Sequence, residues 1–98
     1  MNFESGDPQT AESLKPNANV LFRRLGDEIV LFHLDTDRFY ELNGTAARFW
    51  ELIAAGNQAP DIRRQMLKEF AVESDEFDQE AKTFLASLKK EGLVVANE

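Results

Sequence analysis

The sequence predicts an α+β domain in which a three-stranded antiparallel sheet is followed by three helices. Two observations lead to this class. Between residues 18 and 42, short apolar runs alternate with turn residues, which is typical of an antiparallel meander. From Asn43 onward, apolar residues recur at the helical period of about 3.6 residues. The chain has 98 residues and no internal linker, so these elements are expected to form one domain.

Three strands are expected, at residues 19–25, 28–34 and 38–42. Gly26-Asp27 separates the first two strands and Asp35-Thr36-Asp37 separates the last two, and both segments have the residue types of tight turns. Connections this short place consecutive strands side by side. The first and third strands should therefore form the edges of the sheet.

The middle strand carries apolar residues on both of its alternating faces, which predicts at least partial cover on both sides. His33 shares one face with Ile29 and Leu31. We expect this histidine to be a half-exposed sheet residue rather than a metal ligand or a base, because the chain has no cysteine and no second histidine to complete such a site.

Capping residues and glycines delimit the three helices. The first is expected to begin at Asn43 or Thr45 and to end at Gly56-Asn57, and the second has Pro60 in its first turn. The third is expected to be capped by Ser74 and to end before a glycine, after which a short apolar segment returns to the core.

Residues 1–17 are predicted to form a flexible tail and residues 18–98 the folded domain. The tail is rich in Pro, Gly and small polar residues, with Phe3 and Leu14 as its large apolar residues. A segment of this composition buries too little apolar surface to offset the entropy lost on ordering. Docking of the tail on a partner is the alternative.

The composition argues against several classes of function. With 18 acidic and 11 basic residues, the formal net charge is −7, which disfavours a protein that coats nucleic acid or an anionic membrane. The absence of cysteine excludes disulfides, thiolate metal sites and cysteine nucleophiles. No apolar run is long enough to span a membrane, and the N-terminus lacks the features of a secretory signal. We therefore expect a cytoplasmic protein.

No constellation of residues in the sequence indicates catalysis or a cofactor. The single histidine lies among apolar neighbours, and no glycine-rich phosphate loop is present. The paired carboxylates are explained by turns and by helix N-termini. We therefore predict that the protein is not an enzyme, and that it has no catalytic residues, no metal and no cofactor.

Three helices beside a small sheet form the layout of winged helix-turn-helix domains, which raises the question of DNA binding. The third helix opens with acidic residues that would repel phosphate, so no nucleic-acid partner is expected. With catalysis and nucleic-acid binding disfavoured, the remaining class of function is recognition of another polypeptide. The predicted third strand is an edge with unpaired backbone groups, to which an extended peptide can add as a fourth strand.

A family pattern runs through the stretch VLFRRLGDEIVLFHLDTDRFYELNGTAARFWELI. It contains L-D-T-x-x-x-Y-x-L-N-x-T-A-x-x-x-W-x-L and is followed by a second helix, an acidic third helix and a closing E-G-L-V. With this pattern, residues 20–94 resemble the PqqD family, the small peptide-chaperone domains also called precursor-peptide recognition elements. The resemblance implies a winged helix-turn-helix-like fold of three strands and three helices.

The resemblance also implies a function and a site. In this family, the domain binds the leader segment of a ribosomally synthesised precursor peptide and presents the peptide to a modifying enzyme. The leader lies along the third strand and in the groove between that strand and the third helix. Carried onto this sequence, the peptide-binding residues are Asp37, Arg38, Phe39, Tyr40, Glu41 and Leu42 on the strand, and Phe77, Asp78, Ala81 and Leu85 on the helix. Phe77 and Leu85 also fit the core stripe of the third helix.

The resemblance implies as partners a leader peptide and a modifying enzyme, such as a radical S-adenosylmethionine enzyme, as in pyrroloquinoline quinone assembly, or a leader peptidase. PqqD-like domains also have stand-alone roles in lasso-peptide and related pathways. A homodimer is possible. The alternative is a helix-turn-helix-like regulatory or scaffold domain without a leader ligand. Proline at residue 40 or 42, where the N–H is expected to point outward, should abolish strand addition without unfolding the domain.

Overall fold

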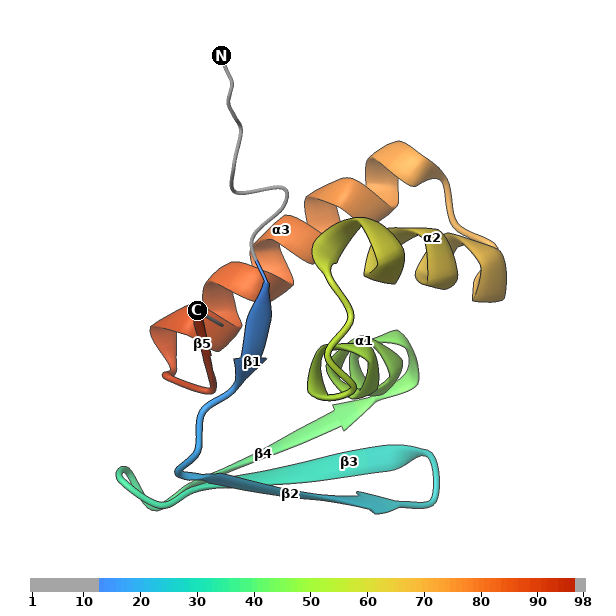
Figure 1. The fold of residues 1–98 in the computed structure, drawn as a ribbon. Coiled ribbons are helices and arrows are strands. Elements are labelled where there is room, and N and C mark those ends of the chain that lie inside the picture. The colour runs from blue at the N-terminus through green and yellow to red at the C-terminus, as the bar shows by residue number, and fades with distance from the viewer. Residues whose placement is uncertain (1–12, 97–98) are drawn as a thin grey trace.

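The computed structural model describes residues 13–96. Its elements follow in the order β1 (Leu14–Pro16), β2 (Val20–Leu25), β3 (Glu28–His33), β4 (Arg38–Asn43), α1 (Gly44–Ala54), α2 (Ala59–Glu69), α3 (Ser74–Lys90) and β5 (Val94–Ala96). β2, β3 and β4 form an antiparallel sheet in sequence order, and β1 pairs with β5 (Figure 1). The predicted order of a three-stranded sheet followed by three helices is confirmed, and each predicted strand of that sheet is placed within one residue.

Two tight turns build the sheet. β2 and β3 are joined by a two-residue turn in which Gly26 has a φ of +64°, a conformation that glycine adopts without steric cost. The turn between β3 and β4 is closed by a hydrogen bond of 2.8 Å from the Asp37 N–H to the His33 carbonyl. Asp37 has a φ of +58°, which aspartate tolerates better than most residues.

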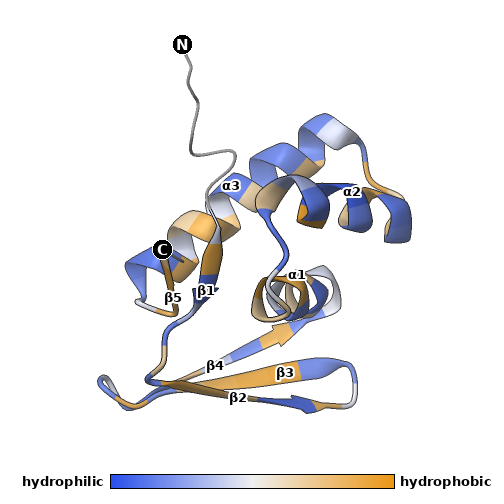
Figure 2. Cartoon of the chain, viewed as in Figure 1, coloured by the Kyte–Doolittle hydropathy of each residue, from blue (hydrophilic) through white to orange (hydrophobic). Residues whose placement is uncertain are grey.

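The helices cover one face of the sheet, with α1 lying directly against it (Figure 1). The core lies in this layer, where Ile29 and Leu31 of β3 and Trp50 and Ile53 of α1 are almost fully buried. Figure 2 shows apolar residues along β3 and α1, whereas much of α2 is hydrophilic. The helical periodicity read from Asn43 onward therefore corresponds to buried faces: that of α1 packs on the sheet, and those of α2 and α3 complete the core around α1 and β5.

Within residues 13–96, no helix lies over the other face of the sheet (Figure 1). Partial cover was predicted here, and Phe32 is indeed half-buried, but by its neighbours in the sheet rather than by a second layer. Its ring lies 4.6 Å from that of Phe39 on β4, measured between centroids. Phe39 itself remains 70% exposed.

His33 is buried, with 4% of its surface exposed, so the prediction of a half-exposed side chain is wrong. The turn after α3 closes over this end of the sheet, and a Cβ added to Gly92 would lie 3.2 Å from the His33 Nε2. Nδ1 of His33 accepts a hydrogen bond of 3.2 Å from the Asp35 N–H. The imidazole is therefore a core residue with a hydrogen bond at Nδ1.

The predicted boundary between tail and domain is also wrong, because β1 lies within the predicted tail. Leu14–Pro16 pairs with Val94–Ala96, and Leu14 is buried. The Asn17 side chain also donates a hydrogen bond of 2.8 Å to the Gly92 carbonyl. These partners lie some eighty residues away in sequence, so local composition gave no sign of them. Residues 1–12 of the predicted tail lie outside the described residues.

The starts of α1 and α3 lie within one residue of the predictions, and α1 ends at Ala54, two residues before the predicted Gly56. Asn43 is the N-cap of α1, although its side chain makes no capping hydrogen bond. Ser74 is the first residue of α3 rather than its cap, since Glu73 occupies the N-cap position. Gly56 and Gly92, with φ of +92° and +71°, follow α1 and α3 as expected for glycines that terminate helices.

Candidate functional site

β4 is an edge strand: in the described part of the chain it pairs with β3 on one side and with no strand on the other. The hydrogen-bonding direction of β3 determines which backbone groups of β4 are free. The Leu34 N–H, directly after β3, donates a 2.9 Å hydrogen bond to the Asn19 carbonyl, directly before β2. Directions alternate along an antiparallel strand, so the backbone groups of even-numbered β3 residues face β2 and those of odd-numbered residues face β4.

The register then identifies the free groups. Ile29 and Leu31 lie opposite Leu42 and Tyr40, so these two β4 residues direct their N–H groups toward β3. Phe39 and Glu41 alternate with them and direct their backbone groups away from the sheet. The expectation that residues 40 and 42 present outward N–H groups is therefore wrong, because it assumed the opposite register of hydrogen bonds.

Side-chain directions in β4 follow the same alternation. Arg38, Tyr40 and Leu42 lie on the face that the helices cover, opposite the β3 residues of the core. Phe39 and Glu41 lie on the uncovered face and are exposed. Asp37 precedes the strand, in the turn.

A polar link joins the start of β4 to the end of α3. Glu91 Oε1 accepts hydrogen bonds from the Tyr40 hydroxyl at 2.7 Å and from the Arg38 guanidinium at 3.1 Å. The Tyr40 hydrogen bond and then the Arg38 charge lower the pKa of Glu91 below its ordinary value. The same hydrogen bond raises the pKa of Tyr40. The link therefore fixes one end of the space between β4 and α3.

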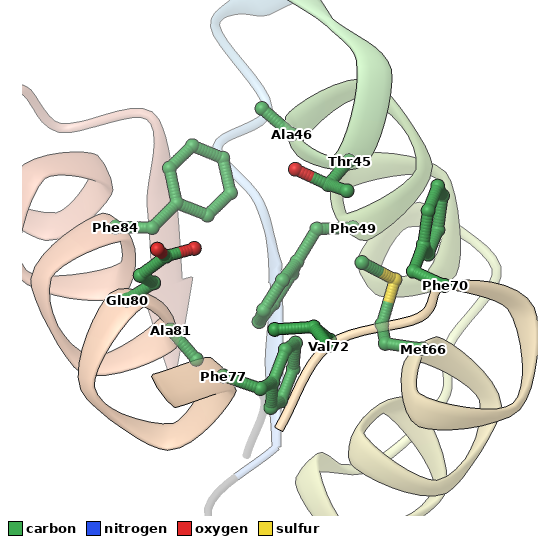
Figure 3. Close-up of a pocket in the computed structure, with 10 residues that line it drawn as sticks. All are labelled: Thr45, Ala46, Phe49, Met66, Phe70, Val72, Phe77, Glu80, Ala81 and Phe84. Atoms are coloured by element: carbon green, nitrogen blue, oxygen red, sulfur yellow. The ribbon is translucent and has the colours of Figure 1, made fainter. Parts of the chain in front are cut away.

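An apolar groove of about 210 Å³ lies at the other end of that space, where β4 runs into α1. We call it the first groove. It is lined by Thr45, Ala46, Phe49, Met66, Phe70, Val72, Phe77, Glu80, Ala81 and Phe84. The Phe49 ring points into it between the rings of Phe77 and Phe84 (Figure 3). The centroid of the Phe49 ring lies 5.3 Å from that of Phe84 and 6.1 Å from that of Phe77.

A larger groove of about 690 Å³, the second groove, lies between α3 and the start of α2. It is lined by Leu14, Phe49, Ile53, Asn57, Ala59, Pro60, Ile62, Arg63, Phe77, Asp78, Ala81, Lys82, Leu85, Ala86 and Lys89. Arg63 forms two hydrogen bonds to Asp78 across it, of 2.8 and 3.2 Å. This pair lowers the pKa of Asp78 and raises that of Arg63.

The four predicted helix residues are divided between the two grooves. Phe77 and Ala81 line both, whereas Asp78 and Leu85 line only the second. Glu80 and Phe84 line the first groove and were missing from the predicted site. Their spacing of three residues from Phe77 and Ala81 places all four on one face of α3, so helical periodicity could have grouped them.

The described residues show no other chemical site of note. Among residues 13–96, no group of three His, Cys, Asp or Glu side chains is placed to hold a metal ion. In the same range, no helix is long and apolar enough to cross a membrane. The arrangement offers an open strand edge, a shallow apolar groove and charged residues around both.

Two solved structures have this fold. One is described as TbiB1 in complex with the TbiA(beta) leader peptide, with a TM-score of 0.80, 25% sequence identity, and coverage of 86% of this chain and 98% of that one. The other is a lasso peptide synthetase B1 complexed with the leader peptide, with a TM-score of 0.76, 19% identity, and coverage of 85% and 98%. No curated protein sequence matches the chain.

The sequence itself matches a family profile over most of the fold. The profile is that of coenzyme PQQ synthesis protein D, and it covers residues 28–94. This range holds β3, β4 and all three helices, and with them both sides of the first groove. With the matching fold, this establishes that the chain belongs to the PqqD family.

Proposed function

We propose that this domain binds the leader segment of a ribosomally synthesised precursor peptide as a fourth strand on β4. The observation that carries the proposal is the unpaired edge of β4 beside an apolar groove. Both of the similar solved structures named above are described as complexes with leader peptides, which supports the same ligand class here. The family membership supports it as well.

The main chain of the leader would pair with the outward backbone groups of Phe39 and Glu41. This pairing depends little on leader sequence, so it supplies affinity rather than selectivity. Successive leader side chains would then point alternately to the two faces of the sheet. Those on the helix side would reach the first groove, where Phe49, Phe77 and Phe84 offer an apolar surface.

Charged residues around the edge would select among leaders. Arg38 has 64% of its side chain exposed while bound to Glu91, so an acidic leader residue can share or replace that partner. Glu41 on the strand and Glu80 on the first groove would favour a basic residue near the other end of the site. Asp78 is engaged by Arg63 on the second groove, so it contributes less to this selection than the sequence suggested.

The domain would act without catalysis of its own, holding the leader while a separate enzyme modifies or cleaves the peptide. A radical S-adenosylmethionine enzyme and a leader peptidase are the two partner classes that we propose for this cytoplasmic role, and a homodimer is compatible with it. The competing hypothesis is a regulatory or scaffold domain without a leader ligand. The many carboxylates of α3 disfavour a DNA ligand for such a domain.

Titration of the ¹⁵N-labelled domain with synthetic leader peptides tests the proposal. Candidate leaders come from short open reading frames beside the gene for this chain. We expect amide shifts at residues 37–42 and at Phe77, Ala81 and Phe84, with affinity that changes little with salt, whereas DNA binding would weaken steeply as salt is added. Shifts confined to other elements, or the absence of binding to every adjacent precursor, would contradict the proposal.

A further inference from the structure

The second groove has no role in the proposed leader site, although it is the larger of the two. Its volume of about 690 Å³ lies within the range of roughly 300–1,000 Å³ typical of ligand sites. Ile53, Ile62 and Leu85 give it apolar walls, and it adjoins the first groove at Phe77 and Ala81, which line both. An open groove of this size with apolar walls is typical of a binding surface.

The charges along the groove limit what that occupant can be. Its lining includes three basic residues, Arg63, Lys82 and Lys89, against one acidic residue, Asp78. The whole chain, in contrast, carries a net charge of −7. The groove therefore favours an acidic segment with apolar side chains, and it disfavours a neutral lipid or a basic peptide.

The chain itself contains a segment of this composition, directly before the first described residue, Ser13. Residues 1–12 include three acidic residues, Glu4, Asp7 and Glu12, and no lysine or arginine. Phe3 supplies a large apolar side chain. The described chain starts at Ser13, directly before Leu14, which lines the groove. The segment is thus tethered at the rim of the groove, which gives it a high effective concentration there.

The length of the segment is sufficient. The ten residue steps from Ser13 back to Phe3 can span up to about 33 Å of extended chain. α3 has 17 residues and is roughly 25 Å long, so Phe3 can reach any point along it.

We propose that residues 1–12 dock into the second groove, with Phe3 among its apolar residues and the acidic side chains beside Lys82 and Lys89. The docked segment would cover the outer side of α3 and contact Phe77 and Ala81, which also line the first groove. The proposal concerns the chain alone and does not depend on a leader peptide.

Paramagnetic relaxation measured by NMR on the full chain tests it. The chain lacks cysteine, so Ser5→Cys gives one site for a nitroxide label next to Phe3. We expect loss of amide signal intensity at Ile62, Leu85 and Ala86, and full intensity at Leu21 on the uncovered face of the sheet. Phe3→Ala in the labelled chain should restore the lost intensity.

A charge-reversal pair provides the matched control. Lys82→Glu on the groove should weaken the paramagnetic effect, whereas Lys68→Glu, exposed on α2 and outside the groove lining, should leave it unchanged. Uniform signal loss, loss on the uncovered sheet face, or no effect of Phe3→Ala would overturn the proposal. Signal loss in an unlabelled ¹⁵N chain mixed with a labelled ¹⁴N chain would also overturn it, because the occupant would then be a second copy.

Discussion

Proline at position 41 gives the sharpest test of strand addition to β4. Glu41 is exposed, lies on the uncovered face and directs its N–H away from β3, so its replacement removes no hydrogen bond of the sheet. Leu42 is half-buried, lies opposite Ile29 and directs its N–H toward β3. The variants Glu41→Pro and Leu42→Pro therefore separate the ligand-facing edge from the sheet-facing one.

The expected magnitudes follow from these backbone groups. Glu41→Pro leaves a leader carbonyl without its donor, which costs about 1–3 kcal/mol and corresponds to a Kd raised about 5- to 150-fold. Leu42→Pro instead breaks the pairing with β3 and should lower the free energy of unfolding by about 1–3 kcal/mol. For a domain of this size, each kcal/mol lowers Tm by about 4–8 °C.

Isothermal titration with a cognate leader and thermal unfolding of both variants supply the measurements, with Glu41→Ala as the control for loss of the side chain. We expect Glu41→Pro to keep its Tm and lose affinity, and Leu42→Pro to lose Tm. A folded Glu41→Pro variant that binds the leader as the parent does would refute strand addition at this edge. If Glu41→Pro instead lowered Tm while Leu42→Pro kept its Tm and lost affinity, the assignment of the outward N–H groups would be wrong.

Three further outcomes are expected. Phe84→Ala should weaken leader binding while the matched Ala86→Ser, on the other side of α3, should not; equal effects would count against the first groove as the leader site. Leu14→Ala should cost about 2–5 kcal/mol of unfolding free energy, measured by urea denaturation, because Leu14 is buried in the core; an unchanged midpoint would restore the predicted tail boundary. Glu91→Gln should destabilise the domain at neutral pH but not in acid. Its pKa is lowered in the folded state, so its contribution is present above its ordinary value near 4.5 and is lost as pH falls through the folded pKa. Urea midpoints for the parent and the variant that differ equally at pH 7 and pH 3 would contradict that link.

Local patterns predicted most of the fold because they act within a few residues. Turn residues such as Gly26 and the helical spacing after Asn43 determine neighbouring structure directly, and the sheet order followed from short connections. β1 escaped prediction because its partner is β5, at the other end of the chain. The burial of His33 was also not predicted, because the turn at Gly92 that covers it lies far away in the sequence.

The strand side of the candidate site could be located from sequence, but its hydrogen-bonding register could not. Alternation within Arg38–Asn43 is visible in the sequence, yet which alternate set faces β3 depends on the turns at both ends of β3. On the helix side, apolar spacing marks a broad stripe on α3. It does not say which residues face which groove, because that depends on where α2 packs.

The packing of α3 connects stability to binding. Of its 17 residues, Phe77 and Leu88 are buried, while the apolar Ala81, Phe84 and Leu85 are only half-buried. Complete burial of a large apolar side chain contributes about 1.5–3 kcal/mol. Because these α3 side chains are only half-buried in the free domain, a bound ligand can gain the rest of that free energy by covering them. Any occupant of either groove would complete this burial and, by linkage, stabilise the folded state. A helix that was packed fully against the core would hold the domain more firmly but would leave no apolar surface for recognition.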